Sequence, residues 1–191
     1  GIGVKNDVLT FVIGGQSPTA LALRDFRGVV TMMGPTGTPF FIPKKKKVLL
    51  MGEGLGNAIL VPALNAMKQA ICHVDYVAYG TMGYEKALRT ADTFQTSLES
   101  SFEPYGPWDY GLFIGSSTFT EHHAKVMKNR IRTLHVSLHA SFMCMMQGVC
   151  GRCLQKDNKG TWIFACHHHH LNEERVDFDF MNQRLRHYRS I

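Results

Sequence analysis

The sequence predicts an α/β protein built on a mainly parallel sheet. Between residues 44 and 140, short continuous apolar runs alternate with segments whose apolar residues recur at helical spacing. This alternation is typical of strand-helix-strand units. The chain has 191 residues, of which 45% are hydrophobic and 19% charged. It is therefore long enough for one domain, or one domain with a small appendage, around a buried core.

Residues 1–43 have the pattern of β structure interrupted by turns. We predict one strand over residues 8–13 and another over residues 28–33, followed by turn chemistry over residues 34–39. Between the strands, Ser17 precedes Pro18. A serine N-cap before a proline favours a short helix over residues 17–23.

Residues 44–140 predict the α/β unit itself. A buried strand over residues 48–51 leads through a glycine turn into a helix over residues 57–71 and a strand over residues 74–79. The further elements that we expect are a helix over 84–101, a proline-rich turn over 104–107, a strand over 110–114, a helix over 118–130 and a strand over 134–138.

Charge and hydropathy narrow the functional classes. The net charge is +6, but residues 44–47 supply four of the positive charges and no basic helix with interleaved aromatics follows them. We therefore do not expect nucleic-acid binding.

No apolar run approaches the roughly 20 residues that cross a bilayer, and no signal peptide is evident, so we expect a cytoplasmic protein that does not bind membranes. Because the chain begins at Gly1 and enters a strand almost at once, we expect a fragment of a longer protein.

Four cysteines near the C-terminus form the strongest chemical motif. Cys144, Cys150, Cys153 and Cys166 have the spacing C-x5-C-x2-C-x12-C. A pair of cysteines two residues apart can bind one metal from a tight turn, so four thiolates are expected to converge on one centre. The bunching of three cysteines approximates the plant-type [2Fe-2S] pattern and favours an iron-sulfur cluster. Structural zinc and unligated thiols remain alternatives.

Neighbouring residues refine this interpretation. Met143, Met145 and Met146 are expected to shield the sulfur atoms from water. Residues 167–170 are four consecutive histidines, which cannot all face one ion from a regular element, so we interpret them as an exposed turn. Cys72 ends a predicted helix and is expected to be a small buried hydrophobe.

Glycines after a predicted strand indicate a candidate nucleotide loop. Gly52, Gly54 and Gly56 lie between the strand and the helix that follows it, where backbone amides and glycines can accommodate a phosphate. The spacing G-x-G-x-G departs from the full dinucleotide fingerprint. A glycine turn that serves only helix packing therefore remains an alternative.

Two further segments could contact phosphates for the same electrostatic reason. The first includes Gly15, Ser17 and Thr19 at the predicted short helix. The second includes Gly115 and Ser116 at the end of a predicted strand, where open α/β sheets bind their ligands. In both segments an ordinary capped helix is the alternative.

The order of these motifs resembles the C-terminal part of a ferredoxin-reductase-like flavoprotein. The resemblance covers nearly the whole chain and is strongest to the dihydroorotate dehydrogenase electron-transfer subunit and to the small subunit of NADH-dependent ferredoxin:NADP oxidoreductase. It implies a remnant of a flavin-binding β-barrel over residues 1–43, a nicotinamide-nucleotide-binding-like domain over 44–140, and a [2Fe-2S] segment with a tail over 141–191. The region 85–108 looks too helical for the extra strand that this family has there.

The resemblance also implies roles for individual residues. Gly15, Ser17 and Thr19 would match the flavin pyrophosphate turn, and residues 34–37 the end of the flavin barrel. Gly52, Gly54, Gly56, Gly115 and Ser116 would belong to the nicotinamide-nucleotide site. The four cysteines would be the cluster ligands.

The function implied by the resemblance is electron transfer between NAD(P)H, FAD and a [2Fe-2S] cluster. FAD binding would need an upstream barrel half that this chain lacks, so the fragment is expected to be inactive alone. The expected partner is a glutamate-synthase-like or dihydroorotate-dehydrogenase-like flavoprotein subunit or domain. The competing hypothesis is a non-catalytic interaction module in which the four cysteines hold a structural zinc ion.

Overall fold

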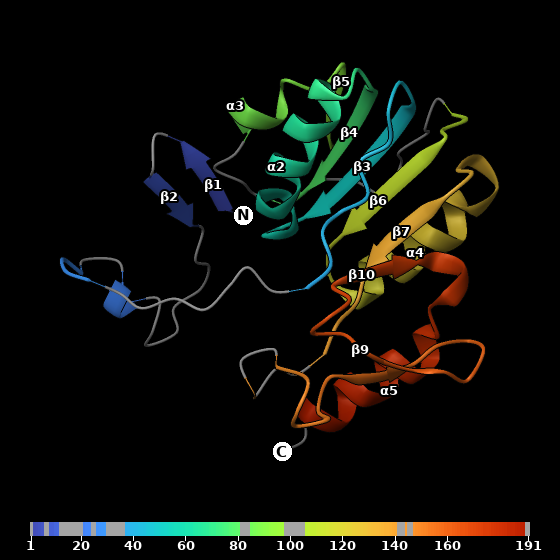
Figure 1. Cartoon of the computed structure of the whole chain (residues 1–191). Coiled ribbons are helices and arrows are strands. Elements are labelled where there is room, and N and C mark those ends of the chain that lie inside the picture. The colour runs from blue at the N-terminus through green and yellow to red at the C-terminus, as the bar shows by residue number, and fades with distance from the viewer. Residues whose placement is uncertain are drawn as a thin grey trace.

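The computed structural model of this chain describes residues 2–5, 8–11, 21–23, 26–29, 37–80, 85–97, 106–140, 144 and 147–189. Its centre is a six-stranded sheet in the order β10-β7-β6-β3-β4-β5. Neighbouring strands are parallel except for β10, which pairs antiparallel with β7 (Figure 1). The predicted α/β class with a mainly parallel sheet is therefore confirmed.

The central strands are buried because their sequences are almost continuously apolar, as parallel strands covered on both faces require. They are β3 (Lys47–Glu53), β4 (His73–Tyr79), β6 (Tyr110–Ile114) and β7 (Leu134–Ser137). The partly polar and mostly exposed strand β5 (Thr93–Ser97) lies at the edge of the sheet. The connecting helices are α2 (Gly56–Gln69), α3 (Glu85–Leu88) and α4 (Ser117–Met127), which a 3-10 turn over Lys128–Arg130 extends. The elements predicted at residues 48–51, 57–71, 74–79, 110–114, 118–130 and 134–138 are all present.

Two hydrophobic cores lie on opposite faces of the sheet. Leu60, Leu64 and Met67 of α2 pack with Val48 and other strand residues in one core. The second core contains alternate strand residues such as Leu49, side chains of α4, and residues of the C-terminal segment. The alternation along β3 explains the division, because successive side chains of a strand point to opposite faces.

The region after β4 corrects the sequence analysis. The sequence predicts a helix over residues 84–101, but the described helix α3 ends at Leu88 and Thr93–Ser97 forms strand β5. β5 pairs in parallel with β4, from Asp75 opposite Thr93 to Tyr79 opposite Ser97. The expectation that the extra strand is missing here is therefore wrong. Thr93, Phe94 and Thr96 are residue types that favour a strand, and pairing along β4 stabilises it.

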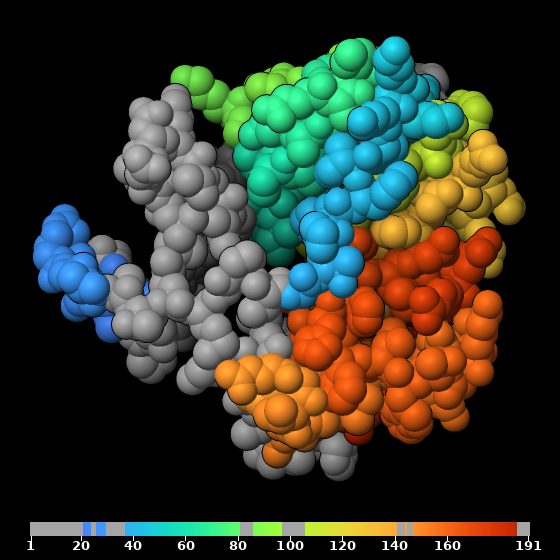
Figure 2. Space-filling model, in the orientation of Figure 1, coloured from blue at the N-terminus to red at the C-terminus, as the bar shows by residue number. Residues whose placement is uncertain are grey.

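The C-terminal segment adds small elements to the sheet domain. They are β8 (Leu154–Lys156), β9 (Trp162–Phe164), β10 (His170–Asn172), a 3-10 turn (Glu173–Arg175) and α5 (Phe178–Arg189). β8 and β9 form an antiparallel pair. In Figure 2, residues 37–43 run down the front of the molecule to this segment. Thr38 fixes that contact, because its amide and its hydroxyl both donate to the carbonyl of His167.

The described N-terminal residues form a hairpin of β1 (Ile2–Lys5) and β2 (Val8–Phe11), and residues 21–23 are helical. These observations agree with parts of the predicted strand over 8–13 and the predicted helix over 17–23. Gly28 and Val29 are not in a strand, and residues 30–36 lie outside the described residues. Among the described residues, no helix combines the length and the hydropathy needed to span a bilayer.

Candidate functional site

The chain direction changes across the sheet between β3 and β6. From β3 the chain continues to β4 and β5 on one side, and it then returns to β6 and β7 on the other. In Figure 1 the carboxyl ends of these parallel strands point toward the same end of the molecule as the C-terminal segment. Open α/β sheets bind ligands at such a switch point, outside the carboxyl ends of the strands. We call this region, formed by residues 52–57, 79, 115–116, 123, 137 and 139, the switch-point crevice.

The glycine turn after β3 is shaped by close contacts. A Cβ atom on Gly56 would lie 2.2 Å from the carbonyl oxygen of Ile114, and one on Gly52 would lie 2.2 Å from Oδ1 of Asn57. Gly54 has φ +53°, and a Cβ there would meet nothing within 4 Å. Gly52 and Gly56 thus serve helix and strand packing, whereas Gly54 faces open space, as a loop that admits a phosphate requires.

Asn57 holds this turn in place from the first turn of α2. Its buried side-chain amide donates to the carbonyl oxygens of Gly54 (3.0 Å) and Tyr79 (3.3 Å), and its Oδ1 accepts from the hydroxyl of Tyr76 (2.9 Å). The amide of Gly54 also donates to the carbonyl of Tyr79. The loop is therefore tied to the ends of two strands before any ligand binds.

The β6 side of the crevice holds a carboxylate. The backbone amide of Ser116 donates to Oε2 of Glu53 at 2.6 Å, while the Ser116 hydroxyl accepts from the amide of Phe119 and caps α4. A Cβ on Gly115 would lie 2.8 Å from Cβ of Glu53. The structure thus places Gly115 and Ser116 beside Glu53, which takes the Ser116 amide that a phosphate would use, and their role in a nucleotide site stays a prediction.

Two histidines extend the polar lining. Nδ1 of His123 lies 2.9 Å from the carbonyl of Phe119, so this nitrogen carries the proton and Nε2 accepts from the hydroxyl of Tyr79 at 3.1 Å. Nε2 of His139 lies 3.1 Å from the hydroxyl of Ser137. Burial lowers the pKa of His123 and of His139. Both imidazoles are therefore neutral near pH 7.

Sequence analysis missed five members of the crevice. Four of them lie at or within two residues of a strand's carboxyl end, and that position is the signal that could have identified them, whereas His123 lies half-buried near the middle of α4. The five members are Glu53, Tyr79, His123, Ser137 and His139.

The cysteines at the same end of the molecule form two pairs. Sγ of Cys153 lies 3.1 Å from Sγ of Cys166, and both side chains are buried in the core that contains Phe113. Cys144 and Cys150 are closer to the surface, and their side chains hydrogen-bond to each other. Cys144 also interacts electrostatically with Cys166, so the two pairs are neighbours.

Backbone amides surround the outer pair. Amides of Cys150, Val149 and Gln147 donate to the Cys144 sulfur and lower the pKa of its thiol to about 6. The amide of Gly148 donates to Cys166, whose pKa burial nevertheless raises to about 11. Gly148 and Gly151 have φ +73° and +68°, which lets the loop turn its amides inward. A loop of this kind stabilises sulfur that carries negative charge.

The four cysteine thiols are arranged as two pairs. This arrangement suits a soft metal centre with two metal ions, each of which binds one pair. Among the described residues, no three Cys, His, Asp or Glu side chains are arranged to bind one ion. A tetrahedral zinc would require all four sulfurs around a single point, whereas a [2Fe-2S] cluster takes two cysteines on each iron. The observed pairs fit the second requirement better. The methionines at 143, 145 and 146 lie outside the described residues.

The histidine run is only in part the exposed turn that we expected. His167 and His168 are exposed, but His170 begins strand β10 and is buried. It pairs with Ser137 of β7 and packs against the rings of Phe40 and His135. Pairing with the sheet overrides the polar character of the sequence at this position. Cys72 is buried, as predicted, and its thiol donates to the carbonyl of Pro43.

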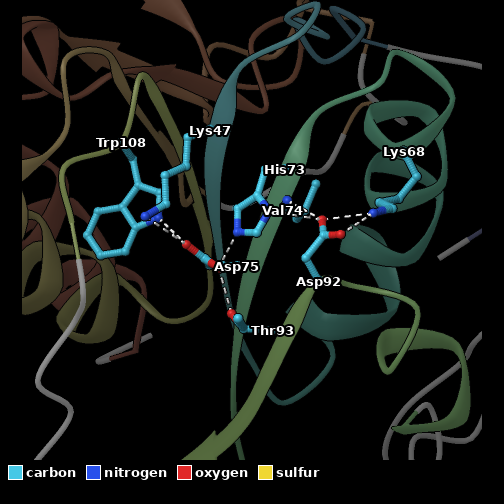
Figure 3. Close-up of polar contacts among 8 residues, drawn as sticks. All are labelled: Lys47, Lys68, His73, Val74, Asp75, Asp92, Thr93 and Trp108. Atoms are coloured by element: carbon cyan, nitrogen blue, oxygen red, sulfur yellow. Dashed lines mark hydrogen bonds and ion pairs between the residues drawn. The ribbon is translucent and has the colours of Figure 1, made fainter.

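A second polar cluster lies at the amino end of the sheet (Figure 3). Asp75 accepts from Nε1 of Trp108 (2.6 Å) and from the hydroxyl of Thr93 (2.7 Å), and it forms ion pairs with Lys47 and His73. These residues line a cavity of about 180 Å³. Because the Asp75 carboxylate is fully engaged by protein donors, this cluster is explained by its structural role in linking β3, β4, β5 and Trp108.

Gly15, Ser17 and Thr19 lie outside the described residues, so the flavin turn stays a prediction. Glycines, serine, histidines and cysteines otherwise meet at one end of an open, mainly parallel α/β sheet. Fold and site thus define an α/β domain with polar side chains gathered at its switch point, where open α/β sheets bind ligands, and a cysteine-bearing segment beside it.

Comparison with known proteins extends this description. No family model matches the chain. The uncharacterized protein RP006 of Rickettsia prowazekii (strain Madrid E) is 27% identical over 190 residues, which covers 97% of this chain and 24% of that protein. The chain therefore spans about a quarter of the length of this relative.

Among solved structures, the chain is similar to one in the study of flavin-based electron bifurcation by NADH-dependent reduced ferredoxin-NADP oxidoreductase. The TM-score is 0.77 at 22% identity, covering 95% of this chain and 72% of that chain. This match supports the mainly parallel α/β fold expected from the sequence, while the barrel remnant over residues 1–43 and the iron-sulfur segment stay predictions. The C-terminal domain of the PF1911 hydrogenase of Pyrococcus furiosus matches over 55% of this chain with a TM-score of 0.46 and 16% identity.

Proposed function

We propose that this chain is an electron-transfer domain of an oxidoreductase, passing electrons between NAD(P)H, FAD and a [2Fe-2S] cluster to a partner flavoprotein. The pairing of Cys144 with Cys150 and of Cys153 with Cys166 is the observation that carries the proposal. The shared fold with a chain of NADH-dependent reduced ferredoxin-NADP oxidoreductase supports it. The partner would be a glutamate-synthase-like or dihydroorotate-dehydrogenase-like subunit or domain.

Each part of the chain has a distinct task in this proposal. Gly54 and the start of α2 would bind the nucleotide phosphates, with Asn57 holding the loop. Cys153 and Cys166 would anchor the cluster in the core, while Cys144 and Cys150 hold its outer side near the surface. When bound, the flavin and the cluster supply the exchange between hydride and single-electron transfer. Residues 1–43 would complete a flavin barrel whose other half lies elsewhere.

Elemental analysis of protein purified without air tests the cluster directly. We expect about two iron atoms and two acid-labile sulfides per chain, as a [2Fe-2S] centre requires, with visible absorption that bleaches on reduction. A colourless protein with about one zinc per chain would contradict this expectation and favour an interaction module with structural zinc.

A pair of cysteine variants assigns the ligands. Cys150→Ser changes an exposed thiol, so it should remove most of the iron and the visible absorption without unfolding the chain. Cys72→Ser is the matched control, because Cys72 is remote from the cysteine loop and its hydrogen bond to Pro43 needs only a donor. Unchanged iron content in Cys150→Ser would remove that residue from the ligand set.

A further inference from the structure

The edge strand β5 is open to pairing with another strand. The sheet ends at β5 on the side away from β10, and no described strand pairs with the outer side of β5 (Figure 1). Side chains on both of its faces are exposed, since Thr93 and Gln95 lie on one face and Thr96 on the other. The outer N–H and C=O groups of an edge strand have no partner within the sheet, so they can pair with a further strand.

β5 has none of the features that protect edge strands in other proteins. Its five residues, Thr-Phe-Gln-Thr-Ser, include no charged residue and no proline. Its pairing with β4 is continuous from Thr93 to Ser97, without a bulge that would twist the edge away. The opposite edge of the sheet differs, because β10 has only three residues and so offers little to pair with.

The sequence of β5 is complementary to itself when two copies run antiparallel. In a pair centred on Gln95, Phe94 of one copy lies opposite Thr96 of the other. Thr93 then lies opposite Ser97, so that all five residues are paired, whereas any other symmetric register pairs fewer. Aromatic–β-branched and Thr–Ser pairs stabilise antiparallel strands, and an uncharged strand brings no like charges together. Such a contact is isologous, because the same residues serve both copies.

The side chain of Gln95 is placed for this contact. Together with Thr93 and Val77 it lines the cavity of about 180 Å³ on the face of the sheet that α2 does not cover. Its carboxamide is exposed and forms no hydrogen bond with a described residue. Because a primary amide both donates and accepts, two glutamines that lie opposite each other can satisfy one another.

We propose that two copies of this chain associate through β5, which pairs antiparallel with β5 of the second copy about a two-fold axis at Gln95. The two six-stranded sheets then form one continuous sheet. Because β10 and the cysteine-bearing segment lie at the other edge of each sheet, the contact leaves both of these segments uncovered. The inference does not depend on the metal centre or on nucleotide binding.

Sedimentation velocity of the full chain tests the proposal, with the protein kept without air so that the exposed Cys150 does not link copies through a disulfide. We expect the wild type to shift from monomer to dimer over about 1 to 100 µM, because a short strand pair is a small interface. Gln95→Lys and Gln95→Glu each place like charges about 5 Å apart at the axis. Each should weaken the dimer at least about tenfold.

A mixture of the two variants identifies the contact. A Gln95→Lys chain opposite a Gln95→Glu chain brings opposite charges together, so the equimolar mixture should dimerise at least as well as the wild type. Gln183→Lys and Gln183→Glu are the matched controls, because Gln183 is exposed on α5, and they should dimerise like the wild type. Far-UV circular dichroism and urea midpoints should be the same for all these proteins.

Three outcomes would overturn the inference. A wild type that stays monomeric over the whole range would show that β5 does not bind a second copy. A dimer that neither Gln95 variant weakens would use another surface of the chain. Folded variants that are monomeric both alone and in the mixture would exclude the pairing of Gln95 with Gln95. None of these outcomes concerns iron or sulfide content, so the proposed function is tested separately.

Discussion

At the scale of single residues, Asp75 shows how a buried charge is kept in a sheet. Asp75 is 9% exposed and Trp108 is 3% exposed. Asp75→Ala would leave the indole N–H of Trp108 without this acceptor and remove one ion-pair partner each from Lys47 and His73. We expect unfolding to become easier by about 2 to 4 kcal/mol in urea titrations. Glu174→Ala should change stability by less than about 0.5 kcal/mol. Equal effects of the two substitutions would contradict this role.

His170 gives a pH dependence whose sign follows from burial. Burial, reinforced by the neighbouring His135, His169 and His168, lowers the pKa of His170 to about 4 from its usual value of 6.5. A folded pKa below the unfolded one means that acid favours the unfolded chain. Stability from this residue is therefore present above pH 6.5 and lost as the pH falls toward 4.

The test compares denaturant unfolding of wild type and His170→Gln at about pH 7 and about pH 4.5, in the same metal state. The wild type should lose roughly 1 to 2 kcal/mol more than the variant, after allowance for partial solvent screening. His122→Gln, on the exposed face of α4, should behave like the wild type. Parallel pH profiles for all three proteins would show that His170 does not carry the effect.

Individual residues also show what sequence patterns can reveal. Spacing and position after a strand make the four cysteines, Gly54 and Ser116 candidates for a site, because those signals are local. They do not identify Glu53, since a glutamate in a glycine turn has no distinctive pattern until β6 brings Ser116 beside it. The interpretation of His170 was wrong for the same reason: its burial depends on pairing with Ser137, far away along the chain.

At the scale of elements, the turn between β3 and α2 is set by how closely α2 approaches β6. Gly56→Ala would place a methyl group 2.2 Å from the carbonyl oxygen of Ile114, a backbone atom that cannot move alone. We expect a loss of roughly 2 to 4 kcal/mol in thermal or urea unfolding. Gly54→Ala meets no atom within 4 Å and should cost only about 1 kcal/mol, from its positive φ. If Gly54→Ala cost more stability than Gly56→Ala, the result would mean that α2 is free to shift away from β6.

Elements were predictable where periodicity is strong and local. β3, α2, β4, β6, α4 and β7 carry continuous apolar runs or clear helical spacing, and the sequence indicated each of them. β5 was mistaken for helix because Thr93–Ser97 is short and partly polar, and it becomes a strand by pairing with β4. β10 likewise depends on β7. Edge strands of this kind are determined by their partners more than by their own residues.

At the scale of the molecule, the cysteine-bearing segment shares a core with the α/β domain. Cys153, Cys166 and Met181 are buried with Phe113 and Val136 of the central strands, and β10 extends the same sheet. Residues 141–191, predicted from the sequence as a separate segment, are thus in direct contact with residues 44–140. A shared core favours unfolding in one step over separate unfolding of two domains.

The two tryptophans allow this cooperativity to be measured, because Trp108 lies beside β6 in the α/β domain and Trp162 lies in β9 of the C-terminal segment. In Trp108→Phe, the fluorescence of Trp162 reports on the segment alone, while far-UV circular dichroism is dominated by the helices and strands of the sheet domain. We expect the two signals to share one urea midpoint in this variant. An earlier fluorescence transition with unchanged dichroism would instead show that the segment detaches first. The cysteines would then be released from Phe113 and Val136 before the sheet unfolds, and the segment would be a separate unit of unfolding in spite of the shared core.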